Sequence, residues 1–189
     1  TFGWATTFSL LVAAVISPLL GALADYARIK KKLFAAFVAL GVLSTAGLFF
    51  LRPGDWEIGR VLFGLANIGA AGSFVFYDAL LPHVARRDEM DRLSTTGYAL
   101  GYLGGGLLLA LNMAWIVKPG WFGLPSGPDL TEAQSTLPAR LSFLSVSVWW
   151  LLFAIPLFRR VPEPPRAPQG RANPRQSLLA ATFTGLART

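Results

Sequence analysis

The segment VLFGLANIGAAGSFVFYDALLPHVARR, residues 61–87, decides what kind of fold this chain has. Its first part, from Val61 to Tyr77, carries no formal charge, and a charged part follows from Asp78 to Arg87. A helix of about 20 apolar residues is long enough to cross the roughly 30 Å hydrocarbon core of a bilayer. The segment therefore predicts a membrane-spanning helix that ends close to Asp78.

The same pattern recurs along the rest of the 189 residues. The chain is 53% hydrophobic and 14% charged, with a mean hydropathy of +0.51, whereas about a quarter of the residues in a soluble domain are charged. We therefore expect an all-α membrane protein with five transmembrane helices, at about residues 4–24, 33–51, 57–81, 93–117 and 139–158.

Composition argues against several kinds of site. The chain has no cysteine, which excludes disulfides and thiolate chemistry, and its single histidine, His83, cannot build a histidine-rich metal cluster. No catalytic pair lies at matching depth in the predicted helices, so we expect no enzyme, no cofactor and no metal site. A net charge of +7 could indicate nucleic acid, but the basic residues lie in alternate loops, and we expect no nucleic-acid partner.

Those alternate loops orient the chain in the bilayer. Loops after the first, third and fifth predicted spans hold twelve Lys and Arg residues, and loops after the second and fourth hold three. Positively charged loops stay on the cytoplasmic side. The first predicted span therefore runs inward from the outer face. Because Thr1 already lies in an apolar run, we expect a further helix upstream.

The connections differ in character. On the outer side, Pro53-Gly54-Asp55 predicts a tight turn, and the spacing of Asp129 and Glu132 predicts a capping box for a short helix over 130–135. Residues 159–176 are rich in Pro and Arg and predict a flexible cytoplasmic linker. Residues 177–189 are amphipathic or lead into another span.

The first cytoplasmic loop, GALADYARIKKK at residues 21–32, resembles the G-x-L-A-D-x-x-G-R-[KR] signature of major facilitator superfamily transporters, which lies between their second and third helices. Arg28 stands in place of the signature's second glycine, and Ile29 in place of its arginine. The resemblance therefore moves the positive role of the signature to Arg28 or Lys30.

Further segments resemble the vacuole-effluxer-like branch of that superfamily over about residues 4–165. These segments are PLLGALAD (18–25), FYDALLP (76–82), GYALGYLGGG (97–106) and WWLLFAIP (149–156). The resemblance implies a major-facilitator-type helix bundle in which the chain supplies helices two to six of an expected twelve. It also implies a C-terminal lobe as partner. The orientation deduced from loop charge agrees with this numbering.

Asp78 has three interpretations. It could be a working acid in the membrane, a solvated interfacial group, or one side of a latch. Arg60 marks the outer end of the same helix, so Asp78 lies at the cytoplasmic end, about 27 Å away at about 1.5 Å per residue. The resemblance implies that such an acid pairs with the loop signature and latches the outward-facing state. The latch residues would be Gly21, Asp25, Arg28, Lys30 and Asp78.

Three glycines on one face of the fourth predicted span, Gly97, Gly101 and Gly105, form a small-xxx-small pattern. Close backbone approach between helices in lipid requires such small residues. The pattern predicts helix packing, and the same surface could also slide during alternating access.

Polar groups inside the spans face protein or a wet cavity, because unpaired polar groups in hydrocarbon are costly. We expect a substrate cavity lined by Asn67, Tyr98, Tyr102 and Trp150, although helix–helix hydrogen bonds would explain each of them as well. Arg60 could extend to the outer interface or contact an anion, and His83 could be solvated or carry protons.

The resemblance and the uncharged cavity candidates together predict a secondary active transporter of a small polar solute. Fungal members of the branch export amino acids, so amino acids are the expected solute. A lipid or lipid-like substrate, moved by a transporter or scramblase, is the alternative. We expect a multi-pass protein of a bacterial plasma membrane, surrounded by lipid.

Overall fold

The computed structural model describes residues 3–4, 6–9, 11–12, 15, 29–81, 84 and 88–163. All regular secondary structure in this part of the chain is helical. The long helices are α2 (Lys30–Gly47), α3 (Trp56–Leu80), α4 (Met90–Val117) and α6 (Leu137–Arg160), and the short ones are η1 (Leu48–Phe50), η3 (Pro119–Phe122) and α5 (Glu132–Ser135).

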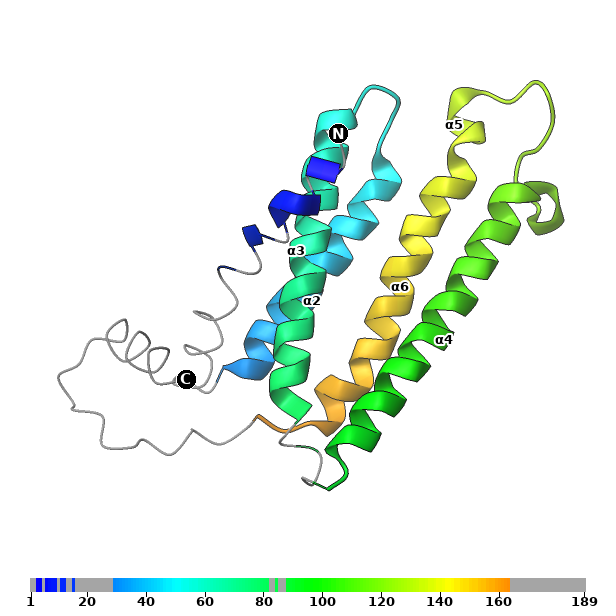
Figure 1. The fold of residues 1–189 in the computed structure, drawn as a ribbon. Coiled ribbons are helices and arrows are strands. Elements are labelled where there is room, and N and C mark those ends of the chain that lie inside the picture. The colour runs from blue at the N-terminus through cyan, green and yellow to red at the C-terminus, as the bar shows by residue number, and fades with distance from the viewer. Residues whose placement is uncertain are drawn as a thin grey trace.

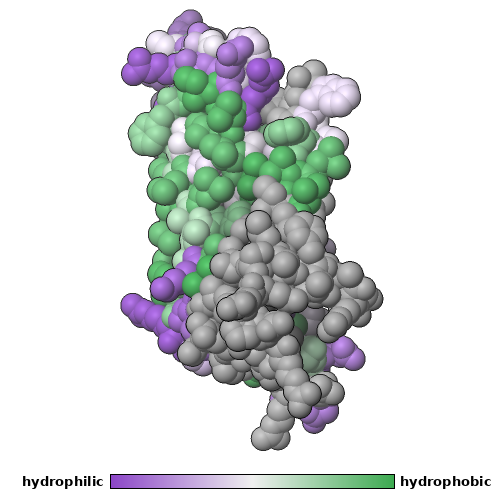
Figure 2. Space-filling model, turned by 90° about the vertical axis from the view of Figure 1, so that its left-hand side faces the viewer, coloured by the Kyte–Doolittle hydropathy of each residue, from purple (hydrophilic) through white to green (hydrophobic). Residues whose placement is uncertain are grey.

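The four long helices lie side by side and alternate in direction (Figure 1). Each is long and apolar enough to cross a membrane. Figure 2 shows the corresponding surface, a hydrophobic belt between polar ends. These helices make the chain an integral membrane protein. The first expected span, 4–24, lies largely outside the described residues. Its described residues up to Val15 are helical, and the count of five spans stays a prediction.

Each long helix overlaps one expected span. When η1 is counted as the end of the α2 span, the ends differ by at most three residues from those expected. The largest differences are at ends predicted to be cytoplasmic, where α2 begins at Lys30 and α4 at Met90 instead of 33 and 93. Below, cytoplasmic and outer name the sides predicted from loop charge. The expected spans follow the uncharged runs, so they leave out the charged first turns of these two helices. A helix nevertheless continues through them, because its internal hydrogen bonds satisfy the backbone in water as well as in lipid.

The best-packed part of the protein lies between α2, α3 and α6. Its buried side chains come from all three helices, and Phe76 of α3 is only 1% exposed. Two ring contacts join them, Phe37 with Phe76 at 5.7 Å between centroids and Phe34 with Phe158 at 5.2 Å. The buried cluster comprises Phe34, Val38, Val42, Phe76 and Ala154.

Helices α2 and α3 approach closely enough that their backbones touch. A Cβ atom on Gly69 would collide with the backbone of Gly41 and would lie 2.9 Å from the carbonyl oxygen of Phe37. A Cβ on Gly72 would meet the Phe37 ring, and one on Gly41 would meet the indole of Trp150. Small residues let helices pack in lipid, where no hydrophobic effect drives them together.

The outer connections are ordered by local hydrogen bonds. The predicted turn after η1 is confirmed. Gly54 has φ +98°, and the amide of Arg52 donates to the Asp55 carboxylate at 2.9 Å. The expected capping box of Asp129 and Glu132 is wrong. Thr131 and Gln134 form the box instead, because a threonine hydroxyl accepts from the third helical amide while the glutamine side chain reaches back.

Helix α4 lies at the edge of the bundle, beside α6 (Figure 1). Polar contacts join their outer halves. The Trp115 indole donates to Ser142 Oγ at 2.9 Å, and Ser145 Oγ donates to Asn112 Oδ1 at 2.9 Å. Long apolar side chains on the remaining faces of α4 are exposed, among them Leu103, Leu107 and Leu109.

Candidate functional site

The cytoplasmic ends of α3 and α4 are joined by a hydrogen bond between a tyrosine and an acid. The Tyr98 hydroxyl donates to Asp78 Oδ1 at 3.2 Å and lies 3.5 Å from Oδ2. Helical side chains point back toward the helix N-terminus, which for α4 is its cytoplasmic end. The Tyr98 ring therefore reaches down from inside the span toward Asp78, which lies in the last turn of α3.

Neighbouring residues shape this contact. Gly97 leaves room for Tyr77, because a Cβ added at Gly97 would lie 3.1 Å from the Tyr77 hydroxyl oxygen. The cytoplasmic ends of α3, α4 and α6 surround a mostly apolar groove of about 280 Å³, which Tyr77, Gly97 and Val161 help to line. The tyrosine–acid contact thus adjoins a space that these helix ends could widen or close.

The expected latch is only partly placed by the structure. Gly21, Asp25 and Arg28 lie outside the described residues. Lys30 begins α2, and the structure shows no ion pair between Lys30 and Asp78. The described partner of Asp78 is Tyr98, so the latch through Arg28 stays a prediction. Position 83, the site of the single histidine, also lies outside the described residues.

The four cavity candidates occupy different surroundings. The Asn67 side chain donates to the carbonyl of Phe63, one turn earlier in α3, at 2.8 Å. Tyr98 and Tyr102 lie one turn apart on α4, and their residues are 43% and 81% exposed. Trp150 packs against the buried cluster and covers Gly41, so the structure gives it a packing role. Contact of any of these with a substrate stays a prediction.

The glycine face of α4 is mostly open in the described part of the chain. A Cβ added at Gly101 or Gly105 would meet nothing within 4 Å. Gly97 faces Tyr77, as described above. The glycines that bring described helices together are instead Gly41, Gly69 and Gly72. Packing of Gly101 and Gly105 therefore requires a partner beyond the described residues and stays a prediction.

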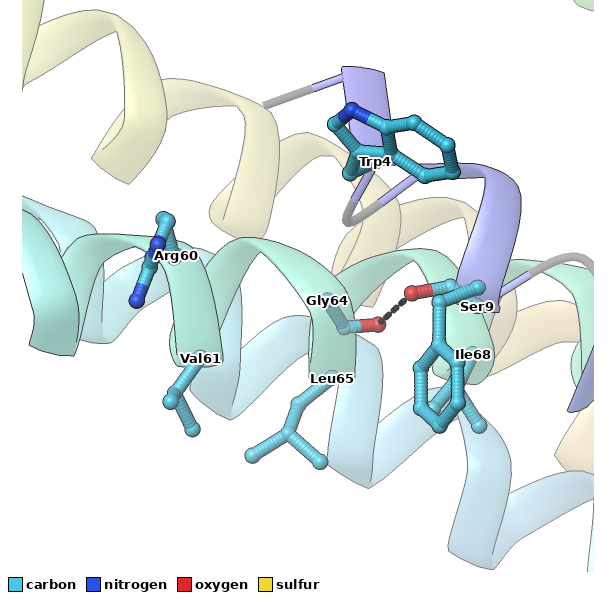
Figure 3. Close-up of a pocket in the computed structure, with 8 residues that line it drawn as sticks. Trp4, Ser9, Arg60, Val61, Gly64, Leu65 and Ile68 are labelled. Carbon is cyan, nitrogen blue, oxygen red and sulfur yellow. Dashed lines mark hydrogen bonds between the residues drawn. The ribbon is translucent and has the colours of Figure 1, made fainter. Parts of the chain in front are cut away.

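At the outer end, Arg60 is held by its own helix. Its guanidinium lies over the Trp56 ring, 4.6 Å from the centroid, and 3.9 Å from the Glu57 carboxylate. The side chain adjoins an apolar groove of about 430 Å³ between the N-terminal residues and α3. Figure 3 shows this groove, where Ser9 Oγ donates to the carbonyl of Gly64 at 3.2 Å.

Sequence reasoning missed two links, one at each end, that join α2 and the following η1 to α6 and the residues just after it. On the outer side, Arg140 Nε donates to the carbonyl of Phe49. On the cytoplasmic side, Lys31 contacts Glu163 and Val161. A signal for the second link is present in the sequence, because three consecutive lysines without a capping residue make a poor helix start and need an acid from elsewhere.

Comparison with known proteins assigns the chain to a family. The family model described as vacuole effluxer Atg22 like matches residues 4–189. The chain belongs to this family. The predicted resemblance to the vacuole-effluxer-like branch is thereby confirmed. No solved structure matches the chain.

Two further comparisons agree with the vacuole effluxer family. The chain is 33% identical to the uncharacterized MFS-type transporter YxiO of Bacillus subtilis, over 84% of this chain and 36% of that protein. It is also 33% identical to Autophagy-related protein 22 of Coccidioides immitis, over 84% of this chain and 33% of that protein. The chain thus spans about a third of the length of these curated relatives.

Proposed function

We propose that this chain forms most of the N-terminal lobe of a secondary active transporter that moves a small polar solute by alternating access. The observation that carries this proposal is the vacuole effluxer family match over residues 4–189. It falls on a chain whose described part holds four membrane-length helices. The name of the Bacillus subtilis relative, an MFS-type transporter, supports the same class. In that superfamily, two lobes rock about a site between them.

We propose amino acids as the solute and the plasma membrane of a bacterium as the location. The exposed face of α4 presents the hydroxyl groups of Tyr98 and Tyr102, and α3 carries the amide of Asn67. Such uncharged polar groups can bind a zwitterion by hydrogen bonds and release it again. A second lobe of the same protein would complete the cavity.

The contact between Asp78 and Tyr98 has a role in this mechanism as part of a cytoplasmic gate. It joins the ends of α3 and α4, and a change in the angle between these helices would break it. A hydrogen bond to a charged group contributes about 1.5–3 kcal/mol. That is enough to bias a two-state equilibrium about tenfold or more.

The test uses the full-length protein in proteoliposomes supplied with a mixture of radiolabelled amino acids. The proposal requires saturable uptake that protein-free liposomes lack and that unlabelled amino acids suppress. Labelled phospholipids in parallel vesicles report lipid movement. Lipid scrambling without solute flux would contradict the proposal and support the alternative substrate class.

A further inference from the structure

We propose that Lys31 and Glu163 cap each other's helices, and that this reciprocal cap holds the first residues after α6 against the start of α2. We call the three contacting residues, Lys31, Val161 and Glu163, the cytoplasmic clasp. The clasp is a conformational device distinct from the contact between Asp78 and Tyr98. Its effect on transport rests on the proposed function, whereas its geometry does not.

The start of α2 is unfavourable on local grounds. Ile29 occupies the N-cap position and provides no side-chain hydrogen bond, and the first turn contains no acid. Lys30, Lys31 and Lys32 fill that turn instead. The first amides of a helix lack internal partners, and the positive end of the helix dipole repels cations. A remote acceptor with negative charge is therefore needed here.

Glu163 supplies this acceptor from 132 residues away in the sequence. The backbone amide of Lys31 donates to the two carboxylate oxygens of Glu163, at 3.1 and 3.3 Å, in a partly buried setting. A carboxylate at a helix N-terminus forms a charge-assisted hydrogen bond and favours the dipole. Glu163 therefore does for α2 what an aspartate at position 29 would do locally.

The opposite exchange takes place at the end of α6. Lys31 Nζ donates to the carbonyl oxygen of Val161 at 2.7 Å, and Val161 is the C-cap residue of α6. A cation near the last carbonyl groups of a helix is favourable. The Glu163 side chain thus binds the backbone of α2, and the Lys31 side chain binds the backbone at the end of α6. The negative charge lies at a helix N-terminus and the positive charge at a helix C-terminus.

The position of the clasp gives it a mechanical consequence. It lies one turn below the Phe34 and Phe158 rings, which join the same two helices at 5.2 Å. Val161 also lines the cytoplasmic groove beside the Asp78 contact. The clasp therefore fixes the spacing of α2 and α6 at the groove. It also positions Lys30, a residue of the predicted latch, and the start of the predicted linker at 159–176.

The first experiment measures hydrogen–deuterium exchange at the start of α2 in the full-length protein in lipid nanodiscs. Glu163→Ala should speed exchange of the Lys31 amide about tenfold, because it loses a charge-assisted acceptor. Glu163→Gln keeps an uncharged acceptor and should have a smaller effect, which also guards against misfolding of the alanine variant. Glu132→Ala, at an exposed glutamate of α5, is the matched control. An unchanged rate in Glu163→Ala overturns the clasp.

The second experiment separates a reciprocal cap from an ordinary ion pair. In a reciprocal cap each side chain binds a separate backbone group, so the double variant Lys31→Met with Glu163→Ala loses two independent bonds, whereas an ion pair is already lost in either single variant. Exchange in the double variant should therefore be faster than in either single variant, by about the product of the two single effects. Exchange no faster than in the faster single variant would indicate an ion pair and would overturn the reciprocal cap. Lys31→Arg, which keeps a cationic donor, should retain near-normal protection, whereas Lys31→Met should not.

Transport measurements test the mechanical consequence. Amino-acid uptake should fall about threefold or more in Glu163→Ala and stay normal in Lys32→Gln, whose exposed lysine belongs to no described clasp contact. Faster exchange with normal uptake would overturn the positioning role. If the unmodified protein moves no amino acid, the proposed function fails, and the exchange results still decide whether the clasp exists.

Discussion

Glycines in α3 and glycines in α4 meet different surroundings in the same bundle. Gly69 touches the α2 backbone so closely that it could not carry a Cβ without displacing that helix, and a Cβ on Gly72 would displace the Phe37 ring of α2. Gly101 and Gly105 face open space in the described part of the chain. Glycine spacing therefore shows that a helix face allows a close approach, but it does not predict which helix, if any, packs against that face. For Gly69 and Gly72 the partner is the described helix α2, whereas no described residue lies within 4 Å of a Cβ at Gly101 or Gly105.

The strongest test of this contrast compares two alanine substitutions in one helix. Gly69→Ala should destabilise the full-length protein by about 2–3 kcal/mol, because its methyl group overlaps the α2 backbone and forces the helices apart. Gly64→Ala is the matched control. Its Cβ would lie 3.4 Å from Ser9 Oγ, so it should be neutral or slightly stabilising. Thermal melting of a fluorescent fusion measures both, and equal melting temperatures would remove the contrast.

A second test asks whether the open face of α4 has a partner in the longer protein. Gly101→Leu should leave expression and melting temperature near normal but lower amino-acid uptake about tenfold, a difference of about 1.4 kcal/mol. The leucine would obstruct a surface that must approach another helix during transport. Leu103→Ala, at an exposed neighbour, is the control. Normal uptake in a well-expressed Gly101→Leu protein would show that this face makes no close approach.

The helices α3 and α4 are also joined by a described side-chain hydrogen bond, from Tyr98 to Asp78. Tyr98→Phe and Asp78→Ala should each slow uptake about fivefold, an effect of about 1 kcal/mol. The double variant should be no slower than the slower single variant, because both changes remove the same bond. Tyr102→Phe should be milder. Additive effects of the two changes would mean that the residues act separately.

The smallest expected effect concerns the outer seam between α4 and α6. Hydrogen bonds between membrane helices contribute about 0.6 kcal/mol on average. Asn112→Ala and Ser145→Ala should each destabilise the protein by about that amount. A double-mutant cycle read from melting temperatures should give a coupling of similar size. A coupling near zero would show that α4 is held to α6 by packing alone.

Sequence reasoning located the described spans well, because long uncharged runs bounded by Arg, Lys, Asp and Glu constrain them strongly. It also placed Asp78 at a helix end. It did not pair Asp78 with Tyr98, since the two lie on different helices and nothing local links them. Trp150 was expected to line a cavity because it lies deep in its span. Depth alone does not tell which face of α6 a side chain occupies, and the structure places Trp150 against Gly41.

The capping residues illustrate the same limit at shorter range. Asp129 and Glu132 have the spacing of a capping box, and so do Thr131 and Gln134. Spacing alone could not choose between them, because the choice depends on where the outer connection turns into the helix. The structure resolves it in favour of Thr131.

The clasp has a consequence for how the protein is made. Lys31 leaves the ribosome well over a hundred residues before Glu163, since the two are 132 positions apart. During synthesis, the start of α2 therefore enters the membrane without its acceptor, and its three lysines stay hydrated on the cytoplasmic side. Only when α6 has been inserted does the acid arrive that completes α2. The order of synthesis thus makes α6, the last described helix, the one that brings the residue completing α2.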